Sequence, residues 1–415
     1  MRMVPSRRAF LRSSGLAGAG AGAGLAAGWV ASNDSRPRPA LAGAEAVEFF
    51  GAHQAGIATP SQEFLQFGAF DMTSGSREDL RGVLMRWSAA AALLARGLPV
   101  GTEATGDEPP DDTGESAGLG PASVTVTFGL GPSLFAGANE DRLGLASLRP
   151  SPLVELPSFR GDALVPGWCG GDLGVQVCAD DPQVAFHALH NLVRIAAPVA
   201  VPRWVLAGAG RTKTSRSQVT PRNLMGFKDG TANIMAQDGA ALDRFVWAGR
   251  PQSPPWMAGG SYLVVRRIAM MLGVWDATGL DAQEATFGRR KLSGAPLTGL
   301  REDDPVDLKA MAGGLPVIPH DAHIRLASPA YGGGERILRR GYSYVDGTDP
   351  AAETLAGGLL FLCYQRDPLR QFIAIQQRLA TSDALSRHIQ HVGSAIFACP
   401  PGTRPGGFVG EGLFA

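Results

Sequence analysis

The sequence predicts an α+β fold in two related halves, and the order of its strands and helices is the observation that predicts it. In residues 43–220, strands and helices follow one another in a β-α-β succession that occurs twice. A similar succession recurs after residue 221. Units of this kind pack helices against one face of a sheet. We therefore expect an N-terminal domain over 43–220 and a C-terminal domain over 221–415.

Capping signals and hydrophobic periodicity define the elements of the first half. A helix is expected over 76–98, because Ser76 can cap it and the apolar residues that follow lie on one face. A second helix is expected over 182–197, with a proline in its first turn. The acidic, proline- and glycine-rich residues 102–118 are expected to form a surface loop. Strands are expected over residues 64–70, 123–130, 174–179 and 201–210.

The second half contains the same kinds of element. Strands are expected over 261–270 and 358–365, where β-branched and aromatic residues are frequent. Helices are expected over 281–291 and 368–380. No short repeat period is present, so the two halves do not form a solenoid.

Residues 1–42 resemble a twin-arginine export signal. Arg7 and Arg8 precede a glycine- and alanine-rich run over 15–30, which is too weakly apolar to be a good membrane-spanning helix. Residues 40–42 fit the small-x-small pattern of a cleavage site. We expect the signal to be removed, which would leave an exported chain, secreted or held in the periplasm or cell envelope, with no integral membrane span. A retained N-terminal anchor is the alternative.

The charge balance argues against a nucleic-acid-binding protein. The full chain has 38 basic and 38 acidic residues. Residues 1–42 contain six arginines and one aspartate, so the remaining 373 residues have 32 basic and 37 acidic side chains, a net charge of −5. Proteins that bind nucleic acids usually carry a basic excess or a basic stripe. The body of the protein is therefore expected to be a mildly acidic globule.

The four cysteines give little support to a metal or c-type haem site. No C-x-x-C or C-x-x-C-H motif is present. Cys178 and Cys363 lie in apolar runs and are expected to be buried core residues. A disulfide remains open, because the pairing of Cys169, Cys178, Cys363 and Cys399 cannot be read from spacing.

Three segments carry candidate functional side chains. Residues 223–233 contain Asp-Gly, which is typical of turns, beside a glycine that allows close backbone approach. Residues 316–327 contain His320 and His323, and extended backbone would place His323 on the same face as Arg325. Residues 336–344 contain two adjacent arginines at a strand start, which can bind an anionic group. Taken singly, a solvated turn, an ordinary histidine and a solvated basic pair are simpler interpretations.

Together these segments resemble the motifs of the dye-decolourising (DyP-type) peroxidases, in particular the exported deferrochelatase and peroxidase subgroup. The resemblance covers Val47 to Cys399, nearly the whole mature chain. It implies two ferredoxin-like domains with antiparallel sheets and helices packed around a haem pocket. It also implies one non-covalent haem b per chain, bound mainly by the C-terminal half. The motifs that carry it are FGAHQAGIATP, VTFGLGPSLF, GFKDGTANI, DAHIRLASP, LRRGYSYVDG and GLLFLCYQRDP.

The resemblance also implies roles for particular residues. His323 matches the ligand of the haem iron, while His320 does not and is expected to be structural or solvated. Asp229 and Arg339 match the catalytic acid and arginine that assist cleavage of the O–O bond of hydrogen peroxide. Gly341 departs from members that have asparagine there, so an additional hydrogen bond found in them is in doubt. Further haem contacts are expected from Gly230, Thr231, Ala232, Ser328, Pro329, Ala330, Arg339 and Phe361.

The expected function is a haem peroxidase that reduces hydrogen peroxide while oxidising a dye, a phenol or another one-electron donor. A deferrochelatase, which releases iron from haem and leaves the porphyrin intact, is one alternative. A non-enzymatic haem carrier or electron-relay protein, with an exported partner, is another. Oligomeric state stays open. Ordinary packing is the favoured explanation for most aromatic residues. The aromatic residues that could instead relay electrons from large donors are Tyr331, Tyr342, Tyr344, Trp204, Trp247 and Trp256.

Overall fold

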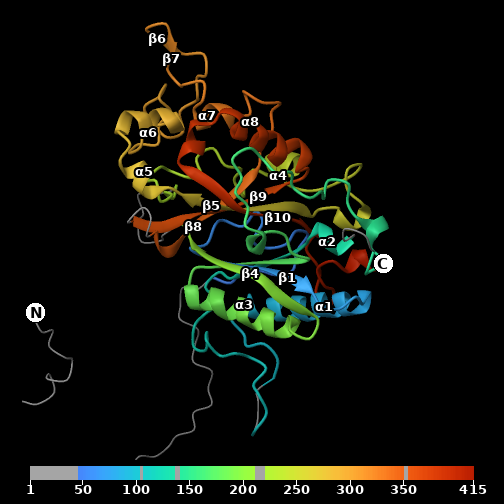
Figure 1. The fold of residues 1–415 in the computed structure, drawn as a ribbon. Coiled ribbons are helices and arrows are strands. Elements are labelled where there is room, and N and C mark those ends of the chain that lie inside the picture. Colours follow the sequence, from blue (N-terminus) through green and yellow to red (C-terminus); the bar gives the residue numbers. More distant parts are fainter. Residues whose placement is uncertain (1–44, 103–105, 136–140, 211–219, 350–353) are drawn as a thin grey trace, which may run out of the picture. The chain divides into compact units, whose positions relative to one another are not determined.

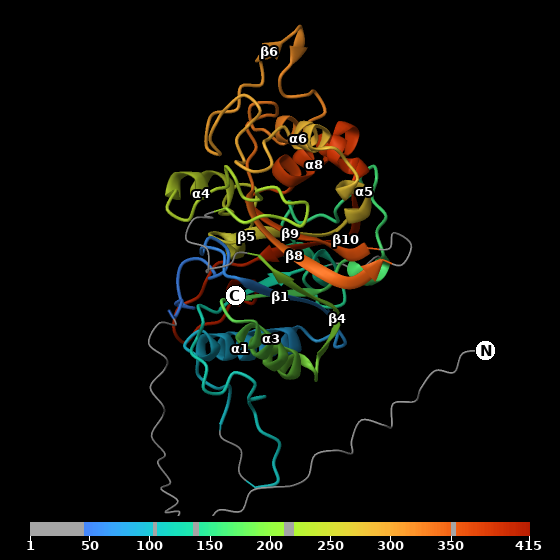
Figure 2. The same ribbon diagram turned by 90° about the vertical axis from the view of Figure 1, so that its left-hand side faces the viewer.

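The structure, a computed structural model, describes residues 45–102, 106–135, 141–210, 220–349 and 354–415 (Figures 1 and 2). These residues belong to one compact unit. The predicted export signal lies outside the described residues. No helix in the described ranges is both long and apolar enough to cross a membrane.

The N-terminal half has the strand order of a ferredoxin-like fold. Its strands are arranged β4-β1-β3-β2, and each hydrogen-bonded pair is antiparallel. Along the chain they form two β-α-β units, which is the ferredoxin-like succession. The elements are β1 (Phe64–Met72), α1 (Arg77–Leu94), β2 (Thr125–Leu130), the short helix α2 (Pro132–Phe135), β3 (Leu173–Ala179), α3 (Pro182–Ala196) and β4 (Ala200–Ala209).

The C-terminal half repeats this topology with a long insertion. Its strands are arranged β8-β9-β5-β10, again antiparallel, and the insertion lies between β5 and β8. The strands are β5 (Ser261–Met270), β8 (Leu338–Asp349), β9 (Thr354–Gln365) and β10 (Ile389–Cys399). The helices are α4 (Gly239–Phe245), α5 (Leu272–Asp276), α6 (Leu280–Phe287), α7 (His323–Leu326) and α8 (Ala374–Ser382), which a π-helical turn (Leu369–Ile373) precedes.

The two sheets join at both edges into one closed eight-stranded barrel. β2 meets β10 at Leu130 and Ala398, and β4 meets β8 at Ala209 and Ser343. Each of these seams has a single register pair, whereas strands within each half pair along their length. The prediction of an α+β fold with two ferredoxin-like halves is confirmed, and the boundary at residue 220 stays a prediction.

The barrel separates two layers of helices. Helices α1 and α3 cover the outer face of the N-terminal sheet, and the helices of the C-terminal half lie beyond the opposite sheet (Figures 1 and 2). The barrel interior is filled by buried side chains from both halves, among them Leu65, Phe67, Leu263 and Phe397. A separate hydrophobic cluster lies on the outer side of the C-terminal sheet and includes Phe227, Trp275 and Leu359.

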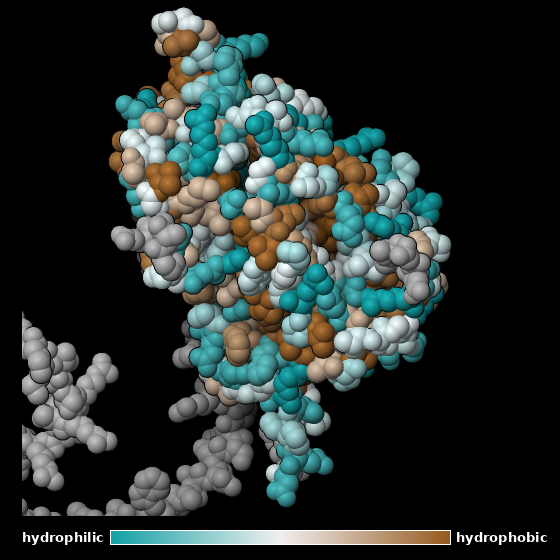
Figure 3. All heavy atoms as spheres, in the orientation of Figure 1, coloured by the Kyte–Doolittle hydropathy of each residue, from teal (hydrophilic) through white to brown (hydrophobic). Residues whose placement is uncertain are grey.

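A two-stranded hairpin, β6 (Met311–Ala312) and β7 (Leu315–Pro316), projects from the insertion (Figure 1). Met311 and Leu315 in it are 61% and 71% exposed, and hydrophobic atoms are visible at that end of the molecule (Figure 3). The hairpin therefore contributes little to the core.

Most of the predicted elements are present. Ser76 caps α1 by accepting a hydrogen bond from the Asp79 backbone amide, as the sequence indicates. The helix predicted over 281–291 is shorter, because Gly288 adopts a left-handed backbone (φ +77°) that ends α6. The extended backbone expected at His323 is wrong: this residue begins α7. Four residues are too few for hydrophobic periodicity to distinguish a strand from a helix. Strand β10 was not predicted.

The four cysteines are free thiols in the structure. Cys178 and Cys363 are fully buried, which confirms the prediction that they are core residues. Burial raises the pKa of the Cys363 thiol well above its ordinary value, so this side chain stays neutral.

A buried ion pair between Arg266 on β5 and Asp162 links the two halves. Each side chain is 1% exposed. Asp162→Asn leaves the guanidinium buried without its counter-charge, so we expect a loss of about 3–5 kcal/mol in the free energy of unfolding, measured by urea denaturation. The exposed pair of Arg203 and Asp71, 2.9 Å apart, is the control, and Asp71→Asn should cost less than about 1 kcal/mol. Equal losses in both variants would contradict this prediction.

Candidate active site

The loop that carries Asp229, residues 221–233 (the Asp229 loop), is fixed on the outer side of the C-terminal sheet. The Asp229 backbone amide donates to the Pro221 carbonyl over 2.8 Å, which closes the loop on itself. The Trp275 indole donates to the Met225 carbonyl over 3.0 Å, and Gly226 adopts a positive φ of +83°. These contacts hold the loop against α5 and the hydrophobic cluster beneath it.

Strand β8 brings Arg339 to this loop. Arg339 Nη1 lies 3.8 Å from Asp229 Oδ1, and Arg339 Nη2 donates to the Thr231 carbonyl over 2.7 Å. The two side chains are 30% and 25% exposed, so both are partly buried but remain open to a small molecule. The neighbouring Arg340 is almost fully buried. The adjacent arginines have different surroundings because successive strand residues point to opposite faces.

His323 is the first residue of α7 and is held by a carboxylate. His323 Nδ1 lies 2.6 Å from Asp383 Oδ2, and Asp383 also accepts a hydrogen bond from the Leu385 backbone amide. Burial lowers the pKa of His323, but the charge and hydrogen bond of Asp383 raise it more, so its pKa lies above the ordinary value. Because Nδ1 is occupied, Nε2 is the nitrogen left to ligate a metal.

His323, Asp229 and Arg339 belong to one site. The charges of Asp229 and Arg339 both act on the pKa of His323, the first raising it and the second lowering it. The sequence separates these residues by up to 110 positions, whereas the fold gathers them between the C-terminal sheet and its helices. The structure therefore brings together the three residues singled out from the sequence as catalytic or metal-binding.

Four of the predicted haem-contacting residues lie on the same elements as Arg339 and Asp229 or beside them. Phe361 on β9 pairs with Gly341 on β8, in register beside the pair formed by Arg339 and Cys363, so it shares the Arg339 face. The predicted haem contacts Gly230, Thr231 and Ala232 belong to the Asp229 loop.

The Ser328–Pro329–Ala330 turn follows α7 directly, and its backbone hydrogen bonds run within 325–334. Pro329 and Ala330 are exposed, and no hydrogen bond or ion pair between described residues joins this turn to Asp229 or Arg339. Their predicted contact with a haem stays a prediction. His320 is exposed, in agreement with the expectation that it is solvated.

Four residues near the site were not predicted from the sequence. Asp383 holds His323, and Asn233 binds the backbone of Arg339. Glu302 accepts hydrogen bonds from Lys228, Thr220 and Thr231. Burial lowers the pKa of the Arg289 guanidinium, and the nearby positive charge of Arg339 lowers it further. Asn233 stands inside the GFKDGTANI motif, but the others lie far from any motif and had no sequence signal.

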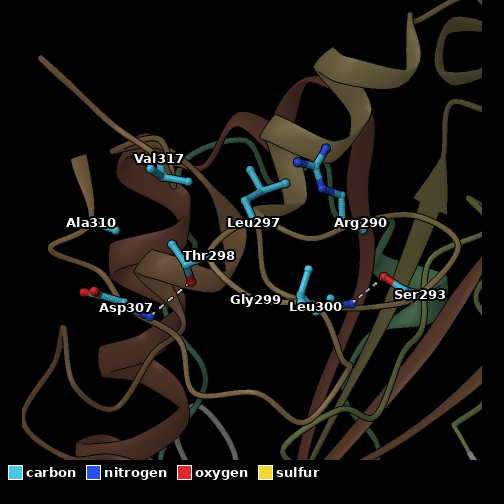
Figure 4. A pocket seen from close by; sticks show the side chains of 10 residues that line it. Arg290, Ser293, Leu297, Thr298, Gly299, Leu300, Asp307, Ala310 and Val317 are labelled. Atoms are coloured by element: carbon cyan, nitrogen blue, oxygen red, sulfur yellow. Dashed lines mark hydrogen bonds between the residues drawn. The ribbon is translucent and has the colours of Figure 1, made fainter. Parts of the chain in front are cut away.

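A separate hollow of about 590 Å³ lies within the insertion and is lined by residues between 290 and 317 (Figure 4). The Asp307 backbone amide donates to Thr298 Oγ1 beside it over 3.3 Å. The exposed Leu300 and the half-buried Leu297 line it, and its lining has no histidine or cysteine. The candidate chemistry is therefore at His323, Asp229 and Arg339 and not in this hollow.

The arrangement of these three side chains indicates a class of protein. A histidine oriented by a buried carboxylate is the usual form of a metal ligand. A carboxylate beside an arginine can move a proton and stabilise negative charge. The three side chains suit an enzyme that carries out proton-coupled chemistry next to a metal-containing group.

Comparison with known proteins identifies the family. Residues 54–209 match the model of the Dyp-type peroxidase N-terminal region, and residues 220–404 match that of the C-terminal region. The chain is 44% identical to a dye-decolorizing peroxidase of Thermobifida fusca over 99% of this chain and 98% of that protein. The chain belongs to the Dyp-type peroxidase family.

Other relatives agree with this assignment. A deferrochelatase of Escherichia coli K12 is 36% identical over 86% of this chain and 84% of that protein. Ferric DtpA from Streptomyces lividans superposes with a TM-score of 0.83 and 42% identity, covering 90% of this chain and 98% of that one. An arginine-to-leucine variant of DypB from Rhodococcus jostii RHA1 in complex with heme has a TM-score of 0.60 at 20% identity, covering 84% of this chain and 95% of that one, which shows the shared fold alone.

The lowered pKa of Glu302 predicts that the free energy of unfolding depends on pH. Burial raises its pKa, but the hydrogen bonds from Lys228, Thr220 and Thr231 outweigh burial and lower the pKa below its ordinary 4.5. A lowered pKa in the folded state means that Glu302 stabilises the protein above the unfolded-state pKa, and that this contribution is lost as pH falls through the folded-state pKa. Wild type should therefore exceed Glu302→Gln in the free energy of unfolding at pH 7, and the difference should shrink below about pH 4.5.

Denaturation at a series of pH values between 3 and 7 measures this difference. Glu108→Gln, at an exposed position in the loop before β2, is the control and should show almost no difference at any pH. A difference between wild type and Glu302→Gln that does not change with pH would contradict the assignment.

Proposed function

We propose that this protein is a haem peroxidase that reduces hydrogen peroxide and oxidises a dye, a phenol or another small one-electron donor. It would hold one non-covalent haem b per chain, with His323 as the iron ligand. The observation that carries the proposal is the imidazole of His323, held by Asp383, in a site where the paired Asp229 and Arg339 are near enough for their charges to act on it. Membership in the Dyp-type peroxidase family supports it.

The residues present fit a haem. His323 Nε2 has no hydrogen-bond partner in the described chain, and one third of the His323 side chain is exposed. The hydrogen bond to Asp383 fixes the ring orientation and increases the electron density at Nε2. Arg339 and Arg289 provide the positive charge that haem propionates need. Phe361 gives an apolar wall on the same face of the sheet. When bound, the haem supplies an iron centre that exchanges electrons with peroxide and with the donor.

The residues of the chain supply the acid–base chemistry. Asp229, as a carboxylate, accepts a proton from one oxygen of hydrogen peroxide and returns it to the other oxygen, which leaves as water. Arg339 stabilises the negative charge that develops on the departing oxygen. Its hydrogen bond to the Thr231 carbonyl keeps the guanidinium beside Asp229 through this step. Both side chains act without moving far, because loop and strand already hold them in place.

Deferrochelatase activity is the second candidate, because relatives with that name are 36% identical over most of the chain. It differs from the first in its product. Anaerobic incubation with haem followed by detection of free protoporphyrin tests for it. Sustained peroxide-dependent oxidation of a dye without protoporphyrin favours the peroxidase. The non-enzymatic alternative is disfavoured by the relationship to dye-decolorizing peroxidases.

We also propose a surface residue through which electrons from large donors enter, and a place outside the cytoplasm where the protein acts. Tyr331, 50% exposed and five residues after α7, is the accessible member of the candidate aromatics, whereas Tyr342 and Tyr344 on β8 are buried. A donor at the surface would therefore be oxidised through Tyr331.

The twin-arginine segment in residues 1–42 supports export of the folded protein with its haem.

Mixing haem-loaded protein with one equivalent of hydrogen peroxide and following haem absorbance tests the main proposal. Asp229→Ala should slow the reaction by about 10²–10⁴-fold, because positioned acid–base catalysis is lost. Arg339→Leu should slow it as well, while haem stays bound in both variants. Asp281→Ala, at an exposed aspartate on α6, is the control and should react like wild type. A wild-type protein that binds haem and does not react with peroxide would overturn the proposal.

His323 and Asp383 are tested by haem titration of the Soret band. His323→Ala should abolish or strongly weaken haem binding, whereas His320→Ala at the exposed neighbouring histidine should bind normally. Asp383→Asn keeps an acceptor for the Leu385 amide and removes the charge beside His323 Nδ1. Its haem affinity should fall by about 10–100-fold. Unchanged affinity in His323→Ala would exclude this histidine as the ligand.

A further inference from the structure

We propose that Asn233 is a positioning residue for the peroxide reaction, whose side-chain amide holds the Asp229 loop on strand β8 so that Asp229 faces Arg339. This inference rests on the proposed function for its kinetic consequence. The hydrogen bonds from which it is argued are present in the chain without haem or peroxide.

The Asn233 amide forms two hydrogen bonds with one residue. Asn233 Nδ2 donates to the Arg339 carbonyl over 2.8 Å, and the Arg339 backbone amide donates to Asn233 Oδ1 over 2.9 Å. Arg339 pairs with Cys363 of β9 on one side, while β8 meets β4 at Ser343, four residues further along. The side chain of Asn233 therefore occupies the place that a neighbouring strand would take at Arg339.

The backbone of the loop is shaped to make this contact. The Asn233 backbone amide donates to the Gly230 carbonyl over 3.2 Å, which closes a tight turn. Within it, Gly230 has φ +132° and Ala232 has φ +58°. A positive φ is unfavourable for alanine, so the surrounding contacts must hold this backbone in place. The double hydrogen bond of the next residue, Asn233, is such a contact.

The same turn holds the other end of Arg339. The Thr231 carbonyl accepts from Arg339 Nη2 over 2.7 Å. Arg339 is therefore bound at its backbone by Asn233 and at its guanidinium by Thr231, with Asp229 two residues before Thr231. The separation of 3.8 Å between Asp229 and Arg339 depends on this turn staying docked on β8.

Asparagine is required because the contact needs one donor and one acceptor in a planar group. Alanine at 233 provides neither. The rest of the loop has its own supports: Arg222 donates to the Gly226 and Lys291 carbonyls, and Trp275 donates to Met225. Loss of the Asn233 amide should thus displace the turn without unfolding the loop.

The test compares wild type with Asn233→Ala, Asn233→Gln and the matched control Asn223→Ala, all loaded with haem. Asn223 accepts a hydrogen bond from the Met225 backbone amide at the opposite end of the loop and, within the described chain, makes no hydrogen bond to β8. Rapid mixing with hydrogen peroxide should show Asn233→Ala slowed by about ten- to a hundredfold, since misplacement of about 1 Å can cost that much. Asn233→Gln keeps the amide and should recover part of the rate. Asn223→Ala should react like wild type.

A second readout does not depend on activity. Hydrogen–deuterium exchange should be faster in Asn233→Ala for the peptide that contains the Arg339 amide, with the Soret band and the exchange of β5 unchanged. Unaltered exchange and rate in Asn233→Ala would overturn the inference, and so would equal slowing in Asn223→Ala. If wild type itself fails to react with peroxide, the proposed function fails, while the exchange data still decide whether Asn233 holds the turn on β8.

Discussion

The opposite orientation of two adjacent arginines on strand β8 is the constraint on which the rest of the structure depends. Successive strand residues point to opposite faces, so Arg339 faces the outer helices while Arg340 enters the barrel. Arg340 donates to the Thr59 carbonyl and to Gln62, which lie just before β1. Strand β8 therefore ties the N-terminal half to the C-terminal sheet with one arginine and organises the site with the other.

This arrangement explains why the site lies outside the barrel and not within it. The barrel interior is closed by side chains from both sheets, and the Arg340 guanidinium inside it donates to the Thr59 carbonyl and to Gln62. The outer face of the C-terminal sheet is covered by short helices and long connections, some before β5 and others in the insertion between β5 and β8. Such connections can present a histidine at a helix start and an aspartate in a loop toward the same space.

Charged side chains hold the residues of the site in position. Asp383 is 4% exposed and reaches His323 from 60 residues further along the chain, so a buried charge fixes the ring that would hold the iron. Asp229 and Arg339 remain partly exposed, as groups that must meet a small reactant do. Glu302 steadies the loop by accepting hydrogen bonds from Lys228 and Thr231 within it and from Thr220 just before it. The positive charges of Arg339 and Arg289 are thus concentrated in a chain that is acidic beyond residue 42.

The sequence by itself determined the fold class, most of the strands and helices, and the three motifs that contain His323, Asp229 and Arg339. It could do so because hydrophobic periodicity and capping are local signals, and because motif residues stand close together in the chain. The tertiary structure alone decided that Asp383 holds His323 and that Asn233 binds the backbone of Arg339. These pairings join residues 60 to 106 positions apart, and no local pattern specifies them. They are set by strand register and by the packing of loops on a sheet, which exist only once the chain has folded.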